Sequence, residues 1–211
     1  MKFSVSDYRV ERLENFVAQD LVVKHHYLHR KAPCSHAFGL FNGCNIVGVI
    51  MYGTPSSAAL RNGICGPEHS HDVIELTRLW VSDKCPRNSE SFLIGRTLRL
   101  IDKPIVVSYA DASVGHIGFV YQATNWIYTG LSAKRTNWHV DGLTENMHSQ
   151  TIADKYSAAE LREMYGDRFK LVDRPRKHRY VMFVGDKRTR KKMRKKLRYP
   201  TLDYPKGAPN D

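Results

Sequence analysis

Apolar and polar positions follow two different periods along the chain, and together they predict a mixed α/β fold. Residues 73–81, VIELTRLWV, are mainly apolar with polar residues interspersed, which is typical of a strand. Residues 105–107, IVV, are fully apolar, as expected of a buried parallel strand. Between them, the spacing of apolar residues over 92–101 predicts a helix, with Asn88 or Ser89 as its N-cap.

The same reasoning predicts further elements on both sides of this core. Asn42-Gly43 lies between two apolar runs and predicts a β-hairpin, whereas 58–71 is expected to be a loop. The other expected elements are helices at 10–21 and 115–124, a strand at 126–131, a helix opened by the capping box Ser157–Glu160, and a last strand at 178–184. Across 74–131, polar residues follow the ends of strands, where ligands bind in open α/β sheets.

Length and composition are those of a globular protein, and we expect one catalytic domain over 1–186 with a basic extension over 187–211. The chain has 211 residues, of which 42% are hydrophobic and 26% charged. Its apolar runs are shorter than the roughly 20 residues that span a bilayer, so no membrane association is expected. Acidic residues near the N-terminus, where a secretory signal would be apolar, and four cysteines without a CxxC pair favour a cytoplasmic protein with free thiols and no cysteine-bound metal.

Positive charge is concentrated near the C-terminus. The net charge is +12, and residues 187–198, KRTRKKMRKKLR, contain nine basic residues and no acidic one, so the rest of the chain carries only 12 − 9 = +3. Such a run favours a nucleic-acid partner, with a solvated or nuclear-targeting tail as the alternative. The predicted contacts are Arg188, Arg190, Lys191, Lys192, Arg194, Lys195, Lys196 and Arg198, on a flexible tail.

The turn before the helix at 92–101 is a candidate anion site. It joins a strand end to a helix N-terminus, where unpaired backbone N–H groups and the helix dipole favour phosphate. The residues expected to hold a cofactor phosphate are Arg87, Asn88, Ser89 and Ser91. The alternative is an ordinary capped helix start.

Three other positions are candidates for chemistry or substrate binding. Asp111 follows the buried strand at 105–107, where a carboxylate can act as a general base, although it can also be a helix N-cap. Tyr121 is either a core residue or a general acid that points into a cleft. His26 and Tyr27 are either substrate contacts or solvated residues at a helix end.

The order strand–turn–helix–strand–helix–strand resembles the core of GNAT N-acetyltransferases, which implies a strongly bent mixed sheet flanked by helices. In that fold the turn carries a Q/R-x-x-G-x-G/A signature that cradles the pyrophosphate of coenzyme A. Here 87–92 reads RNSESF and lacks both glycines, so a tight cradle is not expected. The tyrosine acid of the fold is matched by Tyr121. The resemblance implies acetyl-CoA or a related acyl-CoA as the donor.

A more specific resemblance rests on HHYLHRKAP, ELTRLWVSDKCPRNSES, VVSYADASVGHIGFVYQATNWIYTG and KHRYVMFVG, which span about 25–184. These motifs resemble the phage Mom family, which converts DNA adenine to an N6-methylcarbamoyl derivative that protects phage DNA from restriction. The resemblance implies roles for His26, Tyr27, Ser91, Asp111 and Tyr121, and action in the host cytoplasm. Iron has been considered for that family, and a homodimer is an open alternative to a monomer.

The leading hypothesis is therefore a DNA-modifying transferase that adds an acyl-derived group to N6 of a flipped or unpaired adenine. Asp111 is the expected base and Tyr121 the expected acid, with His26, Tyr27 or Trp126 stacking on the base. Two alternatives stay open: an ordinary N-acetyltransferase for a protein or small amine, and an inactive nucleic-acid-binding module.

Overall fold

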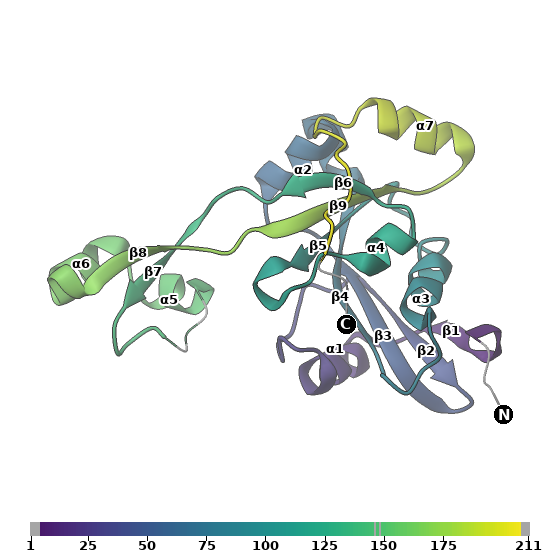
Figure 1. Cartoon of the computed structure of the whole chain (residues 1–211), viewed down its shortest axis with the longest axis horizontal. Coiled ribbons are helices and arrows are strands. Elements are labelled where there is room, and N and C mark those ends of the chain that lie inside the picture. The colour runs from purple at the N-terminus through teal and green to yellow at the C-terminus, as the bar shows by residue number, and fades with distance from the viewer. Residues whose placement is uncertain (1–4, 146, 148, 208–211) are drawn as a thin grey trace.

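The computed structural model describes residues 5–145, 147 and 149–207. Within these residues, seven strands form a mixed sheet in the order β1-β2-β3-β4-β5-β9-β6, and β7 and β8 form a separate hairpin (Figure 1). The strands of the main sheet are β1 (Arg9–Arg12), β2 (His36–Asn42), β3 (Asn45–Gly53), β4 (Val73–Val81), β5 (Ile105–Asp111), β6 (Ile127–Leu131) and β9 (Lys177–Phe183). All neighbouring pairs are antiparallel except β4 and β5. This is the mixed, GNAT-like sheet that the sequence predicted.

Helices cover both faces of the sheet. The helices on one face are α1 (Asn15–His25), α2 (Ala58–Cys65) and α7 (Lys187–Lys195), and those on the other are α3 (Ser89–Thr97) and α4 (Phe119–Ala123). Alternate residues of β3 divide the core accordingly, because Ile50 and Tyr52 pack toward α3 while Val49 and Met51 pack toward α1. Every one of these four side chains is fully buried, so the central sheet is covered on both sides.

The sheet opens between its two parallel strands. β4 and β5 pair only at Val73↔Ile105, Ile74↔Val106 and Glu75↔Val107, and then diverge. A bulge helps to turn β4 at this point: Met51 pairs with Arg78 and Tyr52 with Leu76, so Thr77 is an extra residue on β4. Beyond Glu75, the edge of β4 that faces β5 therefore borders an opening, while the other edge stays paired with β3.

Two positive-φ residues fix the helices beside this opening. Asn88 precedes α3 with φ 72°, a left-handed conformation that asparagine tolerates better than most residues. This conformation turns the chain sharply into α3. Gly118 precedes α4 with φ 83°, and a Cβ there would lie 2.5 Å from the Tyr180 ring. Only glycine fits, and this close approach sets the position of Tyr121 one turn later.

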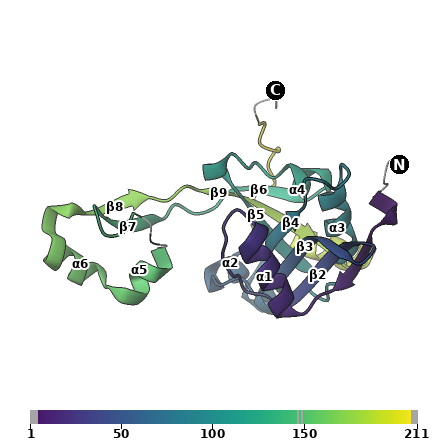
Figure 2. The same cartoon turned by 90° about the horizontal axis from the view of Figure 1, so that it is seen from below.

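Residues 136–173 form an arm that extends away from the sheet (Figures 1 and 2). The arm contains β7 (Thr136–Val140), α5 (Ser149–Lys155), α6 (Ala158–Tyr165) and β8 (Phe169–Asp173). It has its own small core of Val140, Ile152 and Leu161, separate from the clusters of the main sheet. The capping box at Ser157 and Glu160 forms as predicted. We call the segments that join the arm to the sheet, 132–135 and 174–177, the stem.

The basic segment is not a flexible tail. Residues 187–195 form α7, capped by Asp186, and Met193 packs with Ile64 and Cys65 against the sheet. Beyond α7 the chain returns along β6, where the Leu202 N–H donates to the Tyr128 carbonyl at 3.0 Å. Met193 anchors the helix from within α7, and Leu197, just after its end, packs against the same cluster.

The structure confirms most of the predicted elements and corrects others. The hairpin at Asn42-Gly43, β4 and β9 agree closely with the prediction. Residues 58–65, predicted as loop, form α2, and residues 10–12, predicted as the start of a helix, belong to β1. Four 3-10 turns were also not predicted; they span Val5–Asp7, Pro67–Asp72, Ala112–Val114 and Gly166–Arg168. Within the described residues, no helix is long and apolar enough to cross a membrane.

Candidate active site

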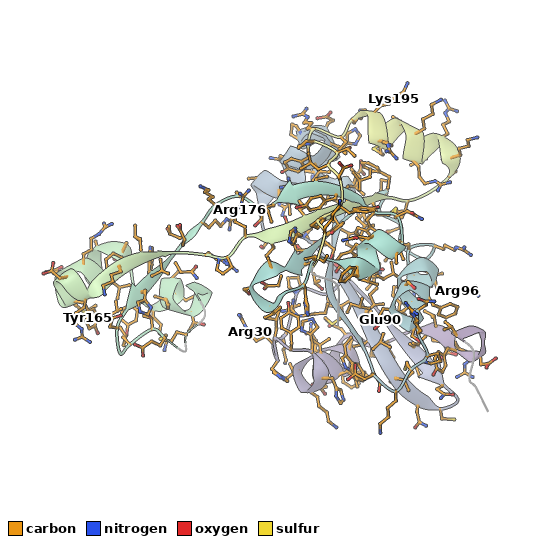
Figure 3. The ribbon with its side chains drawn as sticks, in the orientation of Figure 1. Arg30, Glu90, Arg96, Tyr165, Arg176 and Lys195 are labelled. Atoms are coloured by element: carbon orange, nitrogen blue, oxygen red, sulfur yellow. The ribbon has the colours of Figure 1, made fainter. Side chains whose placement is uncertain are left out.

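A cavity of about 700 Å³ occupies the opening between β4 and β5. It runs through the sheet, because Glu75 and Tyr109 line it from the α2 side while Leu76 and Tyr121 line it from the α4 side. The N-terminus of α3 reaches it through Glu90, labelled in Figure 3. Its other walls come from the end of α1, the start of α2, and the stem of the arm. A cavity of this size is within the range of small-molecule and cofactor sites.

Asp111 lies at the end of β5 and is held by two neighbours. Its Oδ2 is 2.7 Å from the Nζ of Lys177, the residue opposite it on β9, and its Oδ1 accepts from the backbone N–H and the hydroxyl of Ser113. Burial alone would raise the pKa of Asp111, but the ion pair and the Ser113 hydrogen bonds outweigh burial and lower it. The side chain therefore caps the turn at Ala112 and faces the cavity as a carboxylate.

Tyr121 lies on α4 with its hydroxyl buried at the cavity wall. Burial raises the pKa of Tyr121 to about 12, so the phenol keeps its proton at neutral pH. The Ser108 hydroxyl contacts both the Tyr121 oxygen at 2.8 Å and the Leu76 carbonyl at 2.9 Å. Serine has one proton to donate, and when it donates to Tyr121 the phenol proton is free to point into the cavity. This geometry suits a general acid.

Glu75 is a second carboxylate in the cavity, and sequence reasoning did not single it out. It lies on β4 at the last residue that pairs with β5. Burial raises the pKa of Glu75 to about 7, although the nearby charges of Arg78 and Lys177 act in the opposite direction. A carboxylate with this pKa exchanges its proton near neutral pH, which is the property required of a general base.

His26 and Tyr27 form a wall of aromatic rings at the end of α1. Their rings stack at 4.4 Å, and the Tyr27 ring meets that of His116 edge-on at 5.3 Å. Burial lowers the pKa of His26 to about 4, with Arg78 acting in the same direction, so the imidazole is neutral. Its Nδ1 accepts the N–H of Leu28, which leaves the proton on Nε2. Tyr27 is 44% exposed and offers a stacking surface.

The start of α3 fits a phosphate group through its backbone. The N–H groups of Glu90 and Ser91 belong to the first turn and have no carbonyl four residues earlier in the helix. The serine side chains are already engaged, since Ser89 donates to the Pro86 carbonyl at 2.7 Å and Ser91 to the Asn88 carbonyl at 3.0 Å. A coenzyme A pyrophosphate would thus be held by backbone N–H groups and the helix dipole.

The cavity residues do not fit an iron ion. Within the described part of the chain, only His139, Asp141 and Glu145 bring three donor atoms within 4.8 Å of one another, and they lie on the arm. Asp141 is also paired with Lys170 at 3.0 Å. We therefore derive no chemical step through iron.

The structure brings together four of the predicted site residues in one cavity. These are His26, Tyr27, Asp111 and Tyr121. The other predicted residues do not line it: Arg87, Asn88, Ser89 and Ser91 lie at the α3 turn, and Arg188, Arg190, Lys191, Lys192, Arg194, Lys195, Lys196 and Arg198 lie on or just after α7. Trp126, expected to stack on a base, is fully buried.

Sequence reasoning missed Glu75, Arg78 and Lys177. The polar residues within VIELTRLWV were the available indication for the first two. Lys177 could be found only from the pairing of β5 with β9, which is not encoded in either segment alone.

The chain has a mixed sheet that opens between two parallel strands, with a helix N-terminus at the opening, and this is the α/β fold class that the resemblance to GNAT N-acetyltransferases implied. Solved structures with likeness to the chain include a GNAT acetyltransferase from Elizabethkingia anophelis with acetyl-CoA bound (TM-score 0.47, 10% identity, 84% of this chain and 99% of that one). An IAA acetyltransferase from Bacillus cereus gives a TM-score of 0.47 at 9% identity, over 84% of this chain and 99% of that one.

Sequence comparison gives the family. Residues 7–206 match the Mom protein family, and the chain belongs to it. The chain is 30% identical over 213 aligned positions to the methylcarbamoylase Mom of Escherichia phage Mu, covering 97% of this chain and 86% of that protein.

Proposed function

We propose that this protein is a DNA-modifying transferase that adds an acyl-derived group to the exocyclic N6 amine of adenine, on the path to methylcarbamoyladenine. The observation that carries the proposal is a single cavity that combines an aromatic wall, a half-buried carboxylate of raised pKa, a buried phenol and a helix N-terminus. The relative named as a methylcarbamoylase supports the choice of group. In a phage, the product would protect DNA from restriction in the host cytoplasm.

The target base must leave the duplex to enter this cavity, because N6 is stacked and paired within the helix. Flipping it out costs a few kcal/mol. Tyr27 offers an exposed ring at the cavity wall, and base–aromatic stacking contributes about 1–3 kcal/mol. The Nε2–H of His26 is a donor on the same wall, suited to a ring nitrogen of adenine.

The two carboxylates divide the work at the N6 amine. Adenine N6 is a weak nucleophile, since its lone pair is delocalised into the ring, so a proton must leave as the new bond forms. We assign the base to Glu75, whose pKa is near 7, rather than to Asp111 alone. Asp111 stays ionised beside Lys177 and accepts a hydrogen bond from the same amine. Environments that push two carboxylate pKa values apart commonly mark such separate roles.

Tyr121 serves as the acid on the opposite side of the cavity. When bound, an acyl-CoA would supply a thioester carbon for attack by N6 and a thiol as the leaving group. The Tyr121 phenol gives its proton to the departing sulfur and is left hydrogen-bonded to Ser108. This accounts for bond formation at N6; the amide nitrogen and the CH2 linkage of a methylcarbamoyl group require a further reaction.

The exposed basic side chains of α7 would hold the phosphate backbone. They lie on the outer side of the helix, as Lys195 shows in Figure 3, while Met193 faces the sheet. Contacts of this kind give affinity that falls steeply as salt rises and carry no sequence preference.

Nucleoside mass analysis tests the proposal. DNA from cells that express the protein should contain deoxyadenosine of increased mass, and Glu75→Gln should abolish the product while Glu163→Gln, on the outer arm, should not. Unmodified DNA from cells with soluble wild-type protein would refute the proposal. Acetylation of small amines without change to DNA would identify an ordinary N-acetyltransferase, and DNA binding without coenzyme binding or product would identify an inactive binding module.

A further inference from the structure

The stem of the arm is a hydrogen-bonded connection that lines the cavity. Its two segments are held together by backbone hydrogen bonds, from Ser132 N–H to the Lys177 carbonyl and from Arg174 N–H to the Arg135 carbonyl, each at 2.8 Å. The guanidinium of Arg176 also crosses the stem and donates to the carbonyl of Ser132 at 2.6 Å. Figure 3 shows Arg176 where the arm leaves the sheet, with Tyr165 at the outer end.

The stem is strongly basic. Of its eight residues, five are basic and none is acidic. Two of the five have structural partners, since Arg176 holds the stem backbone and Lys177 pairs with Asp111. Arg135 and Arg174 line the cavity, and neither forms an ion pair with any acidic residue in the described part of the chain.

Two guanidinium groups without an acidic partner at the lining of one cavity favour an anion there. A guanidinium presents a planar fork of donors that matches the oxygens of a phosphate. The basic residues of α7 do not reach this place, because none of them lines the cavity. An anion at the mouth would therefore meet the stem arginines and not the basic helix.

We infer that Arg135 and Arg174 bind the DNA phosphates that flank the nucleotide whose base enters the cavity. This inference rests on the proposed function for the identity of the nucleic acid. The stem lines the cavity at the ends of β6 and β9, whereas Tyr27 lines it at the end of α1. The phosphate and the base would therefore bind at different walls of the cavity. Contacts to phosphate carry no sequence information, and the stem thus sets the position of the nucleotide rather than the choice of site.

The salt dependence of DNA binding tests the inference. The variant Arg135→Gln/Arg174→Gln is compared with Lys155→Gln/Arg99→Gln, which removes the same charge from exposed positions outside the cavity. The probe is a short unmodified DNA duplex, titrated over a series of salt concentrations. Loss of two phosphate contacts lowers the slope of log K against log salt by about 1.8, which is roughly a 60-fold weaker complex at about 0.1 M salt.

The stem variant should show this loss, and the control should keep a slope close to that of the wild type. An Arg135→Lys/Arg174→Lys variant keeps the charge and should retain most of the slope, which separates lost charge from a disturbed stem. The inference is overturned if the stem variant binds like the wild type, or if the control loses as much as the stem variant.

Nucleoside mass analysis of the same proteins keeps the two proposals apart. Wild-type protein that forms no modified adenine, while the stem arginines still control DNA affinity, would refute the proposed function and leave the stem as a phosphate site. The opposite result would refute the stem inference alone. In that case both the stem variant and the control variant modify adenine at the wild-type rate, and both bind DNA with the wild-type salt slope.

Discussion

Replacing Glu75 by glutamine should raise stability at pH 8 and strongly reduce activity, because the same buried charge that serves the reaction costs folding free energy. The pKa of Glu75 is about 7 in the folded protein against 4.5 for an ordinary glutamate, a difference of about 2.5 units. Between these values the folded protein holds a proton that the unfolded chain has lost, so stability falls as pH rises through this range. At pH 8 the cost is at most about 3.5 kcal/mol, taking about 1.4 kcal/mol for each pKa unit.

Glutamine cannot ionise, so Glu75→Gln escapes this cost. Denaturant unfolding at pH 5 and at pH 8 should show the variant and the wild type close together at the lower pH, with the variant more stable at the higher pH. Glu163→Gln, exposed on α6, should follow the wild type at both. A variant with no gain at pH 8 relative to pH 5 would show that Glu75 is not held at a raised pKa.

Activity should move in the opposite direction. With Glu75 as the base, the wild-type rate of adenine modification should rise about tenfold per pH unit below pH 7 and level off above it, and Glu75→Gln should lose about 100- to 10,000-fold. A variant that is stabilised at pH 8 but keeps the wild-type rate and pH profile would show that the base lies elsewhere, with Asp111 as the next candidate.

Three further substitutions test the rest of the site. Tyr121→Phe keeps the ring but removes the phenol proton, so product formed, measured by mass, should fall about 100-fold or more while the melting temperature changes little; an active variant would exclude the acid role. Lys177→Met leaves Asp111 without its ion pair, and denaturant unfolding at pH 7 should show a loss of about 1–3 kcal/mol. Met193→Ala should cost about 2–4 kcal/mol in the same assay, because α7 is anchored by that buried side chain; no loss would mean that α7 does not depend on it.

The sequence predicted those elements whose structure depends on residues close together in the chain. The hairpin at Asn42-Gly43, the capping box at Ser157 and the buried strand β5 each depend on residues close together in the chain. α2 was missed because Asn62 and Gly63 lower helix propensity, and tertiary packing of Ile64 and Cys65 overrides it.

The site was only half predictable for a related reason. Asp111 ends a strand that the sequence predicts, and Tyr121 lies on the helix that comes next along the chain. Their proximity could therefore be expected, because a strand and the helix after it lie side by side in an α/β sheet. The significance of Glu75 depends on where β4 and β5 diverge, and that of Lys177 on the pairing of β9 with β5, a contact between segments more than sixty residues apart in sequence. Neither the divergence nor the pairing is encoded in the composition of one segment.

The amount of positive charge and its position have different consequences for a DNA-modifying enzyme. The run at 187–198 dominates the net charge, and attraction to a polyanion depends on charge summed over the surface. Reaction at N6 depends instead on the position of one nucleotide, because a misplacement of about 1 Å can cost about 100-fold in rate, and this requires donors fixed beside the cavity. The stem offers two arginines on a hydrogen-bonded backbone beside the cavity, although its five basic residues carry less charge than the nine of the run at 187–198. Affinity for DNA and placement of the target base are therefore expected to depend on different surfaces of this protein.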